Sequence, residues 1–165
     1  MATADDECSH LLKCYSSVSF SLVLCLTGCQ QDQAFSTVAD SFVDSLRFPS
    51  SNGVFSPSDR IFLRTLLGSL LERCRTLQAG AFNLSGLEEQ PPAKRHILRV
   101  VKEALFALSF DSRALLLLRD QANLAYADIA AVLSLSVKDV KVAVCQARIQ
   151  LRDKVNEVME HAGRR

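Results

Sequence analysis

The sequence predicts an all-α protein made of two small helical domains joined by a flexible linker, the second domain ending in a helix-turn-helix. Apolar residues recur at three- and four-residue steps along most of the chain, which is the period of one buried helical face, and no segment alternates like a strand. Glycine, asparagine and two prolines interrupt this period within residues 76–93. The predicted units are therefore a helical domain over 8–75, a linker over 76–93 and a second domain over 94–160.

Three helices are expected in the first domain. The first ends at Gly28, and the second runs from about Asp32 to Leu46. The third starts after Ser56 as the cap, with Pro57 at the first helical position. The expected buried faces are, in order, Leu11, Tyr15, Val18, Leu22 and Leu26; Phe35, Val38, Ala39, Phe42 and Leu46; and Phe62, Leu63, Leu66, Leu67, Leu70, Leu71 and Cys74.

The second domain is expected to hold a fourth helix marked by Ile97 to Leu108, a fifth from Arg113 to Asp120, and a helix-turn-helix over 122–152. The corner of that unit is Ser134-Leu135-Ser136, which is too short for anything but a sharp turn. Ser136 can cap the last helix, and Asp139 three residues later can complete a capping box. The buried face of the last helix is expected to be Val140, Val144, Ala147, Leu151, Val155 and Val158.

A cationic stripe runs along the last helix, away from its valine face. Lys138, Lys141, Arg148 and Arg152 fall within an arc of about 80° on a helical wheel. Lysine and arginine neutralise phosphates, and arginine can also contact guanine edges in the major groove. The pattern alone leaves two interpretations open: a DNA-binding face, or an ordinary solvated face on a core helix.

Five segments of the second domain form a recognisable pattern in their order and spacing: Leu108-Ser109-Phe110-Asp111-Ser112-Arg113, Tyr126-Ala127-Asp128-Ile129-Ala130, Leu133-Ser134-Leu135-Ser136, Val140-Lys141 and Ala147-Arg148-Ile149-Gln150-Leu151-Arg152. Together they resemble the C-terminal domain of small bacterial sigma factors of the extracytoplasmic-function (ECF) class. The resemblance implies a polymerase-binding first domain that melts the downstream promoter element, and a second domain that reads the upstream element. It implies core RNA polymerase, promoter DNA and an anti-sigma protein as partners.

The resemblance also implies roles for individual residues. The DNA-binding set is Lys138, Lys141, Val142, Cys145 and Arg148 on the last helix, with Arg64, Arg73 and Arg75 on the third. The polymerase-binding pair is Asp40 and Phe42. A solvated helix edge explains the three arginines of the third helix nearly as well, and Phe42 fits a core position.

Departures from the family pattern leave a second function open. The acidic pair of the second helix is replaced by Phe35 and Ser36, and the central arginine and asparagine of the third helix are replaced by Leu67 and Gly68. In the second domain Ser109 replaces the family's proline and can cap a helix, and the other departures are Ala125, Val142, Ala143 and Gln146. The alternative is therefore a sigma-like binding module, a decoy for an anti-sigma protein or polymerase, without initiation activity.

Composition argues against other classes. Residues 1–48 carry two basic and six acidic side chains, and residues 49–165 carry seventeen basic and twelve acidic ones. This asymmetry of charge is suited to nucleic-acid binding at one end of the chain. The six cysteines lack the spacings of zinc sites, so no metal or other cofactor is expected. The three histidines are scattered without a nucleophile or acid at usable spacing, so the chain is not expected to be an enzyme.

One motif points away from the cytoplasm. Leu26-Thr27-Gly28-Cys29 is similar to a bacterial lipoprotein cleavage box, but the preceding residues are acidic rather than basic, as an export leader would need. No apolar stretch is expected to approach the roughly 20 residues that span a bilayer. A cytoplasmic protein without membrane contact is the prediction.

Overall fold

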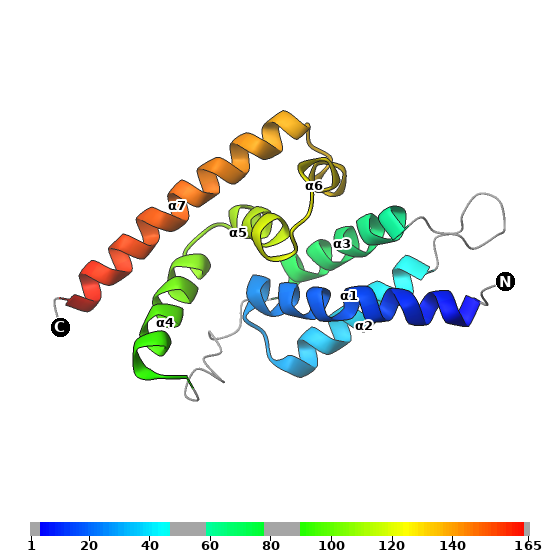
Figure 1. The fold of residues 1–165 in the computed structure, drawn as a ribbon, viewed down its shortest axis with the longest axis horizontal. Helices are drawn as coiled ribbons and strands as arrows, with labels where there is room; N and C mark the ends of the chain where they lie inside the picture. Colours follow the sequence, from blue (N-terminus) through cyan, green and yellow to red (C-terminus); the bar gives the residue numbers. More distant parts are fainter. Residues whose placement is uncertain (1–3, 47–58, 78–89, 164–165) are drawn as a thin grey trace.

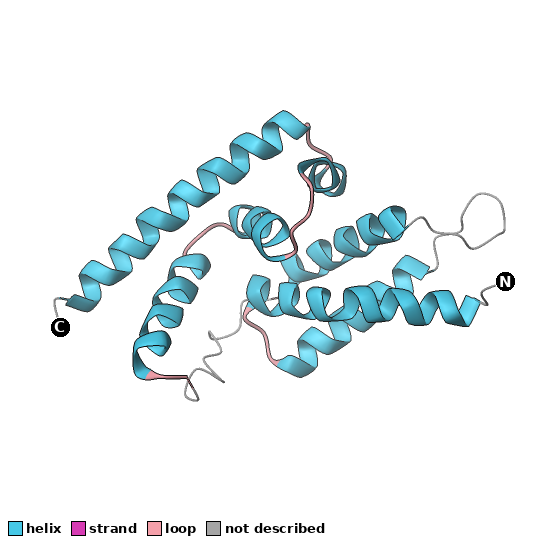
Figure 2. Cartoon of the chain, in the orientation of Figure 1, coloured by secondary structure: helices cyan, strands magenta, loops and turns pink. Residues whose placement is uncertain are grey.

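The computed structural model describes residues 4–46, 59–77 and 90–163, and all regular structure in these ranges is helical (Figures 1 and 2). This confirms the predicted all-α class. The elements are α1 (Ala4–Thr27), α2 (Gln31–Leu46), α3 (Asp59–Thr76), α4 (Pro92–Phe106), α5 (Phe110–Leu116), the short π-helix η1 (Leu117–Gln121), α6 (Tyr126–Leu133) and α7 (Val137–Gly163). We call α1–α3 the N-terminal half and α4–α7 the C-terminal half. The cap predicted at Ser56 and most of the predicted linker lie outside the described residues.

The N-terminal half is built around Phe62 of α3. Its ring lies 6.1 Å from the ring of Tyr15 and 5.6 Å from that of Phe42, so one aromatic side chain joins all three helices. Gly28 closes α1 with a left-handed backbone (φ 65°), and its N–H donates to the carbonyl of Leu24 at 2.9 Å. Glycine tolerates this conformation at a helix end without steric cost, which confirms the predicted stop.

The buried face of α2 differs from the predicted one. Phe35 is 70% exposed and Ala39 is also exposed, so placing them in the core was wrong. The buried face instead carries small and hydroxylic residues, namely Ala34, Thr37, Val38, Ser41, Phe42 and Ser45. Each hydroxyl of this set donates to the carbonyl four residues earlier, which satisfies its hydrogen bond inside the helix. Val18 of α1, 39% exposed, was likewise wrongly placed in the core.

Serine caps define the C-terminal half. Ser109 accepts the N–H of Ser112 at 3.2 Å at the start of α5, and Ser136 accepts the N–H of Asp139 at 3.0 Å at the start of α7. The Asp139 carboxylate accepts the Ser136 hydroxyl at 2.7 Å, whereas a capping box would bring it to the backbone N–H. Both caps were predicted, and only the partner of the Asp139 carboxylate differs.

The two halves share one hydrophobic core. α3 packs against α2 and α1 and also against α6, while α1 contacts α5 and η1. At about 100° per residue, Leu67 and Leu71 lie roughly 140° and 180° around α3 from Phe62, on a different side of the helix. Both are buried, in the same cluster as Ile129 and Val140. The predicted domain boundaries stay a prediction, but the described parts of the two halves are packed together.

Polar contacts also join the halves beside this core. A guanidinium N–H of Arg113 donates to the carbonyl of Leu26 at 2.5 Å. Arg75 pairs with Asp111 at 2.6 Å, and the Gln121 amide donates to the hydroxyl of Ser21. The two residues of each pair come from α1 or α3 on one side and from α5 or η1 on the other. The interface therefore has an apolar centre and a polar rim.

One expectation about membranes was wrong. Ser9–Thr27 of α1 is long and apolar enough to cross a bilayer by length and composition, with a mean hydropathy of 1.3. A third of this window is buried in the fold, and a core helix of a soluble protein passes the same test. Cys29, the residue that the lipoprotein box would acylate, is buried in the core.

Candidate nucleic-acid interface

The helix-turn-helix corner rests on one residue with an uncommon backbone. Ser134 ends α6 in the left-handed region (φ 55°, ψ 41°), and its N–H and that of Leu135 both donate to the carbonyl of Ala130. Two residues later Ser136 caps α7, so the chain reverses within the predicted tripeptide. Ile129 and Val140, each fully buried, hold the two helices together.

The predicted recognition face of α7 is free of the N-terminal half. Lys138, Lys141, Val142, Cys145 and Arg148 are all exposed, Val142 by 49%. The opposite face of the helix buries Val140, Val144 and Ala147. The structure therefore brings together the five residues predicted on this helix. Their contact with DNA stays a prediction.

Arg148 is engaged within the protein. Its Nη2 lies 2.5 Å from Oδ1 of Asp120 and its Nε lies 3.3 Å from Oδ2, a bidentate pair between α7 and η1. The hydrogen bond to Asp120 raises the pKa of Arg148. Sequence reasoning missed Asp120, because its partner is 28 residues away and no helical period links them. The pair holds the guanidinium in one fixed orientation at the edge of the exposed face.

Tyr126 is a second residue that sequence reasoning did not place at this face. Its ring lies 5.8 Å from Nζ of Lys141 and 4.7 Å from the guanidinium carbon of Arg119. Cations over an aromatic face are attracted by its quadrupole. Tyr126 therefore gathers two positive charges where α6 begins, beside the recognition face.

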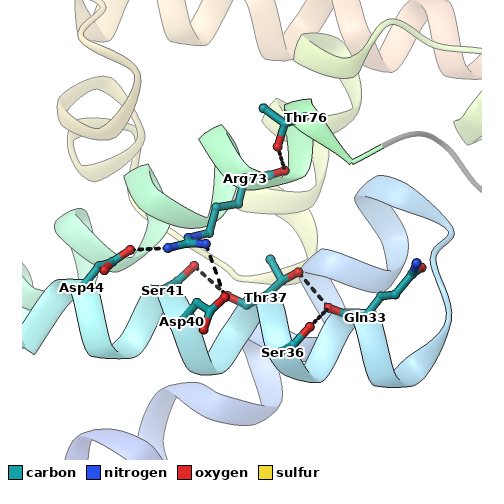
Figure 3. Close-up of polar contacts among 8 residues, drawn as sticks. All are labelled: Gln33, Ser36, Thr37, Asp40, Ser41, Asp44, Arg73 and Thr76. Atoms are coloured by element: carbon teal, nitrogen blue, oxygen red, sulfur yellow. Dashed lines mark hydrogen bonds and ion pairs between the residues drawn. The ribbon is translucent and has the colours of Figure 1, made fainter.

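The predicted DNA-binding and polymerase-binding residues of the N-terminal half pair with each other. Arg73 of α3 donates to Asp44 at 2.5 Å and to Asp40 at 3.4 Å on α2 (Figure 3). The hydrogen bond to Asp44, and then the charges of both aspartates, raise the pKa of Arg73. Residues predicted to contact different partners thus form one ion-pair cluster, and Asp44 is its strongest acceptor.

The remaining predicted residues of this half lie in different surroundings. Arg75 pairs with Asp111 and lies over the ring of Phe110 at 5.4 Å, while Arg64 is exposed. Phe42 is 4% exposed, so it supports α2 from inside the core and offers no side-chain surface to a partner in this arrangement. Within the described ranges, no three histidine, cysteine or acidic side chains gather as metal ligands would.

Comparison with known families identifies part of the chain. Residues 98–151 match the family model described as Sigma-70, region 4. The match covers about a third of the chain, from Leu98 in α4 to Leu151 in α7, and includes α5, η1, α6 and the first part of α7. It supports a sigma-factor-like transcription regulator, in which this region interacts with promoter DNA and RNA polymerase. No curated protein and no solved structure matches the chain.

Proposed function

We propose that this chain is a sigma factor of the ECF class, which binds core RNA polymerase and directs it to specific promoters through α6 and α7. The observation that carries the proposal is the exposed cationic face of α7 in a segment similar to sigma-70 region 4. The capped start of α7 and its buried valine face give the rigid placement that a recognition helix needs.

The chemistry of this face suits both backbone and base contacts. Lys138 and Lys141 would neutralise phosphates, and Arg148 would donate two hydrogen bonds to a guanine. Val142 offers an apolar surface that fits a thymine methyl group, and Cys145 lies beside it. To reach a base, Arg148 must exchange the carboxylate of Asp120 for the DNA acceptor. Since that carboxylate is half-exposed, the exchange does not disturb the core.

The N-terminal half would bind the polymerase clamp through the outer side of α2, which includes Asp40. An anti-sigma protein is a further expected partner of this class, and we place the protein in the cytoplasm, where the polymerase is. In this assignment Arg64, Arg73 and Arg75 face the non-template strand. Arg73 and Arg75 would first have to leave the carboxylates that they now bind.

One observation favours the alternative, a sigma-like decoy without initiation activity. Leu67 stands where the family has an arginine, and it is 2% exposed in the core shared by the two halves. A decoy needs to bind an anti-sigma protein or polymerase but not to melt DNA. A buried leucine in place of that arginine fits this requirement.

The test combines polymerase binding with transcription. The full chain should co-purify with core polymerase and support promoter-dependent transcription in vitro. Changing Lys141→Ala and Arg148→Ala together should abolish most transcription, leave polymerase binding intact and flatten the salt dependence of DNA binding by roughly one unit per lost phosphate contact.

The matched control is the pair Arg99→Ala and Lys154→Ala, which removes the same charge outside the recognition face. If the control and the test pair lower transcription equally, the groove assignment is wrong. If the parent binds polymerase but transcribes from no promoter, the decoy function is correct instead.

A further inference from the structure

A cavity of about 270 Å³ lies where the two halves meet. Its lining includes Thr27 at the end of α1, Cys74 and Arg75 at the end of α3, and Phe110 and Arg113 of α5. Ligand pockets usually measure about 300–1,000 Å³, and one water takes about 30 Å³. The cavity is therefore large enough for a small organic or inorganic molecule and too small for a nucleotide or a peptide.

Arg113 places an uncompensated positive charge beside this cavity. The residue is 8% exposed, and its guanidinium donates only to main-chain carbonyls, those of Leu26 at 2.5 Å, Leu108 at 3.2 Å and Phe106 at 3.4 Å. The guanidinium carbon also lies 4.4 Å from the ring centroid of Phe106. None of these groups carries a negative charge, and Nε has no hydrogen-bond partner.

Burial of such a charge is unfavourable by itself. Desolvation lowers the pKa of Arg113, and no carboxylate of the described residues offsets it. Buried charges in proteins are normally paired or fully hydrogen-bonded, because an ion loses several kcal/mol of hydration on leaving water. An anion in the adjoining cavity would supply the missing opposite charge.

Arg75 adds a second cation at the more exposed part of the lining. Its side chain is 56% exposed, and one of its nitrogens pairs with Asp111 at 2.6 Å. Its other N–H donors have no acceptor among the described residues. Arg75, Arg113 and Asp111 together give the lining a net positive charge. The side chains of Leu26, Leu77 and Phe110 supply apolar surface beside these cations.

We propose that this cavity binds a small anion bearing carboxylate or phosphate oxygens, attracted by Arg113 and hydrogen-bonded by Arg75. The apolar lining accommodates a short carbon skeleton. A ligand held here contacts α1, α3 and α5 at once, so it stabilises the packing of the N-terminal half against the C-terminal half. This inference does not depend on DNA binding or on polymerase, and the test uses neither.

The test titrates the full chain with inorganic phosphate, and separately with succinate, at constant ionic strength set with chloride. Isothermal titration calorimetry and the melting temperature should both show saturable binding to at least one of the two probes. Asp111→Asn should tighten binding, and Arg75→Gln should weaken it, each by roughly fivefold, the effect of a unit charge about 4 Å away in bulk water. Both side chains are largely exposed, so these variants keep the fold.

The ion pair of Arg152 with Asp153 on α7 supplies matched controls. Asp153→Asn and Arg152→Gln make the same charge changes at an exposed pair that does not line the cavity, and should leave binding unchanged. Arg113→Met should abolish binding if it folds, and the Arg75 and Asp111 variants decide the matter if it does not. Absence of saturable binding, or equal responses of the test and control variants, would overturn the proposal.

Discussion

Truncating Leu67 to alanine tests whether the N-terminal and C-terminal halves unfold as one unit. Leu67 is 2% exposed and belongs to the same core cluster as Ile129 of α6, the helix against which α3 packs. Removal of a buried leucine side chain costs about 2–5 kcal/mol, made up of lost burial and the cavity left behind. For a chain of this size each kcal/mol lowers the melting temperature by about 2–4 °C, so the expected loss is roughly 4–20 °C.

Hydrogen exchange measured by mass spectrometry locates the effect. In Leu67→Ala, exchange protection should fall by the same factor in peptides of α1–α3 and in peptides of α5, η1 and α6, because these elements share one core. Ile61→Ala is the matched control on the same helix, since Ile61 is 62% exposed and its truncation should change stability by less than about 0.5 kcal/mol. If only α1–α3 lose protection, the halves are energetically independent and the reasoning is refuted.

Three further predictions concern single residues. Asp120→Asn should tighten DNA binding a few-fold by releasing Arg148, and weaker binding in gel-shift titrations would mean that Asp120 positions this arginine instead. Ser134→Gly should raise the free energy of unfolding by about 1 kcal/mol in urea titration, because glycine adopts φ 55° without strain; a loss of stability would contradict this. Burial raises the pKa of Cys74 to about 12, so iodoacetamide at about pH 8 should label the exposed Cys145 and spare Cys74. Since the pKa of the thiol in the unfolded chain is near its ordinary value of 9.0, Cys74 should stabilise the fold below that pH and lose this contribution as the pH rises towards 12. Urea midpoints measured across that range would show the loss.

The helices and their ends were predictable because their signals are local. Gly28, Ser109 and Ser136 act through hydrogen bonds to residues three or four positions away, and each ends or begins a helix as predicted. The exposed face of α7 follows from the same period of about 3.6 residues. The buried face of α2 escaped prediction because Ser41 and Ser45 satisfy their hydroxyls within the helix, which no count of apolar residues detects.

The neighbours of each helix could not be predicted. A helical period shows which side of a helix is apolar but not which element covers it. The broad apolar face of α3 was recognised, and the structure gives the cause of its width. Phe62 contacts the rings of Tyr15 on α1 and Phe42 on α2, and α3 packs against α6 as well. Arg73, Arg75 and Arg148, all predicted to bind DNA, form ion pairs in the structure. Each of their acidic partners is at least 28 residues away in sequence.

The run of leucines from Leu115 to Leu118 was predicted to lie in one helix. The structure has an α-helix followed by a π-helix there. All four side chains are buried, although four consecutive residues of an α-helix point in different directions. The chain changes from α5 to the π-helix η1 within this run. α5 packs on α7, and η1 contacts α1. Side chains on different sides of this segment are therefore all covered.

The shared core has a consequence for how the protein is made. During synthesis α3 is complete well before α6, and at ~5–20 residues per second the interval lasts several seconds. Throughout it, the part of the shared core that α5, η1, α6 and α7 supply is missing, and the carbonyl of Leu26 lacks its donor Arg113, 87 residues further on. The nascent N-terminal half therefore presents an apolar stripe to the cell, so the yield of folded protein should depend on how quickly the second half is translated.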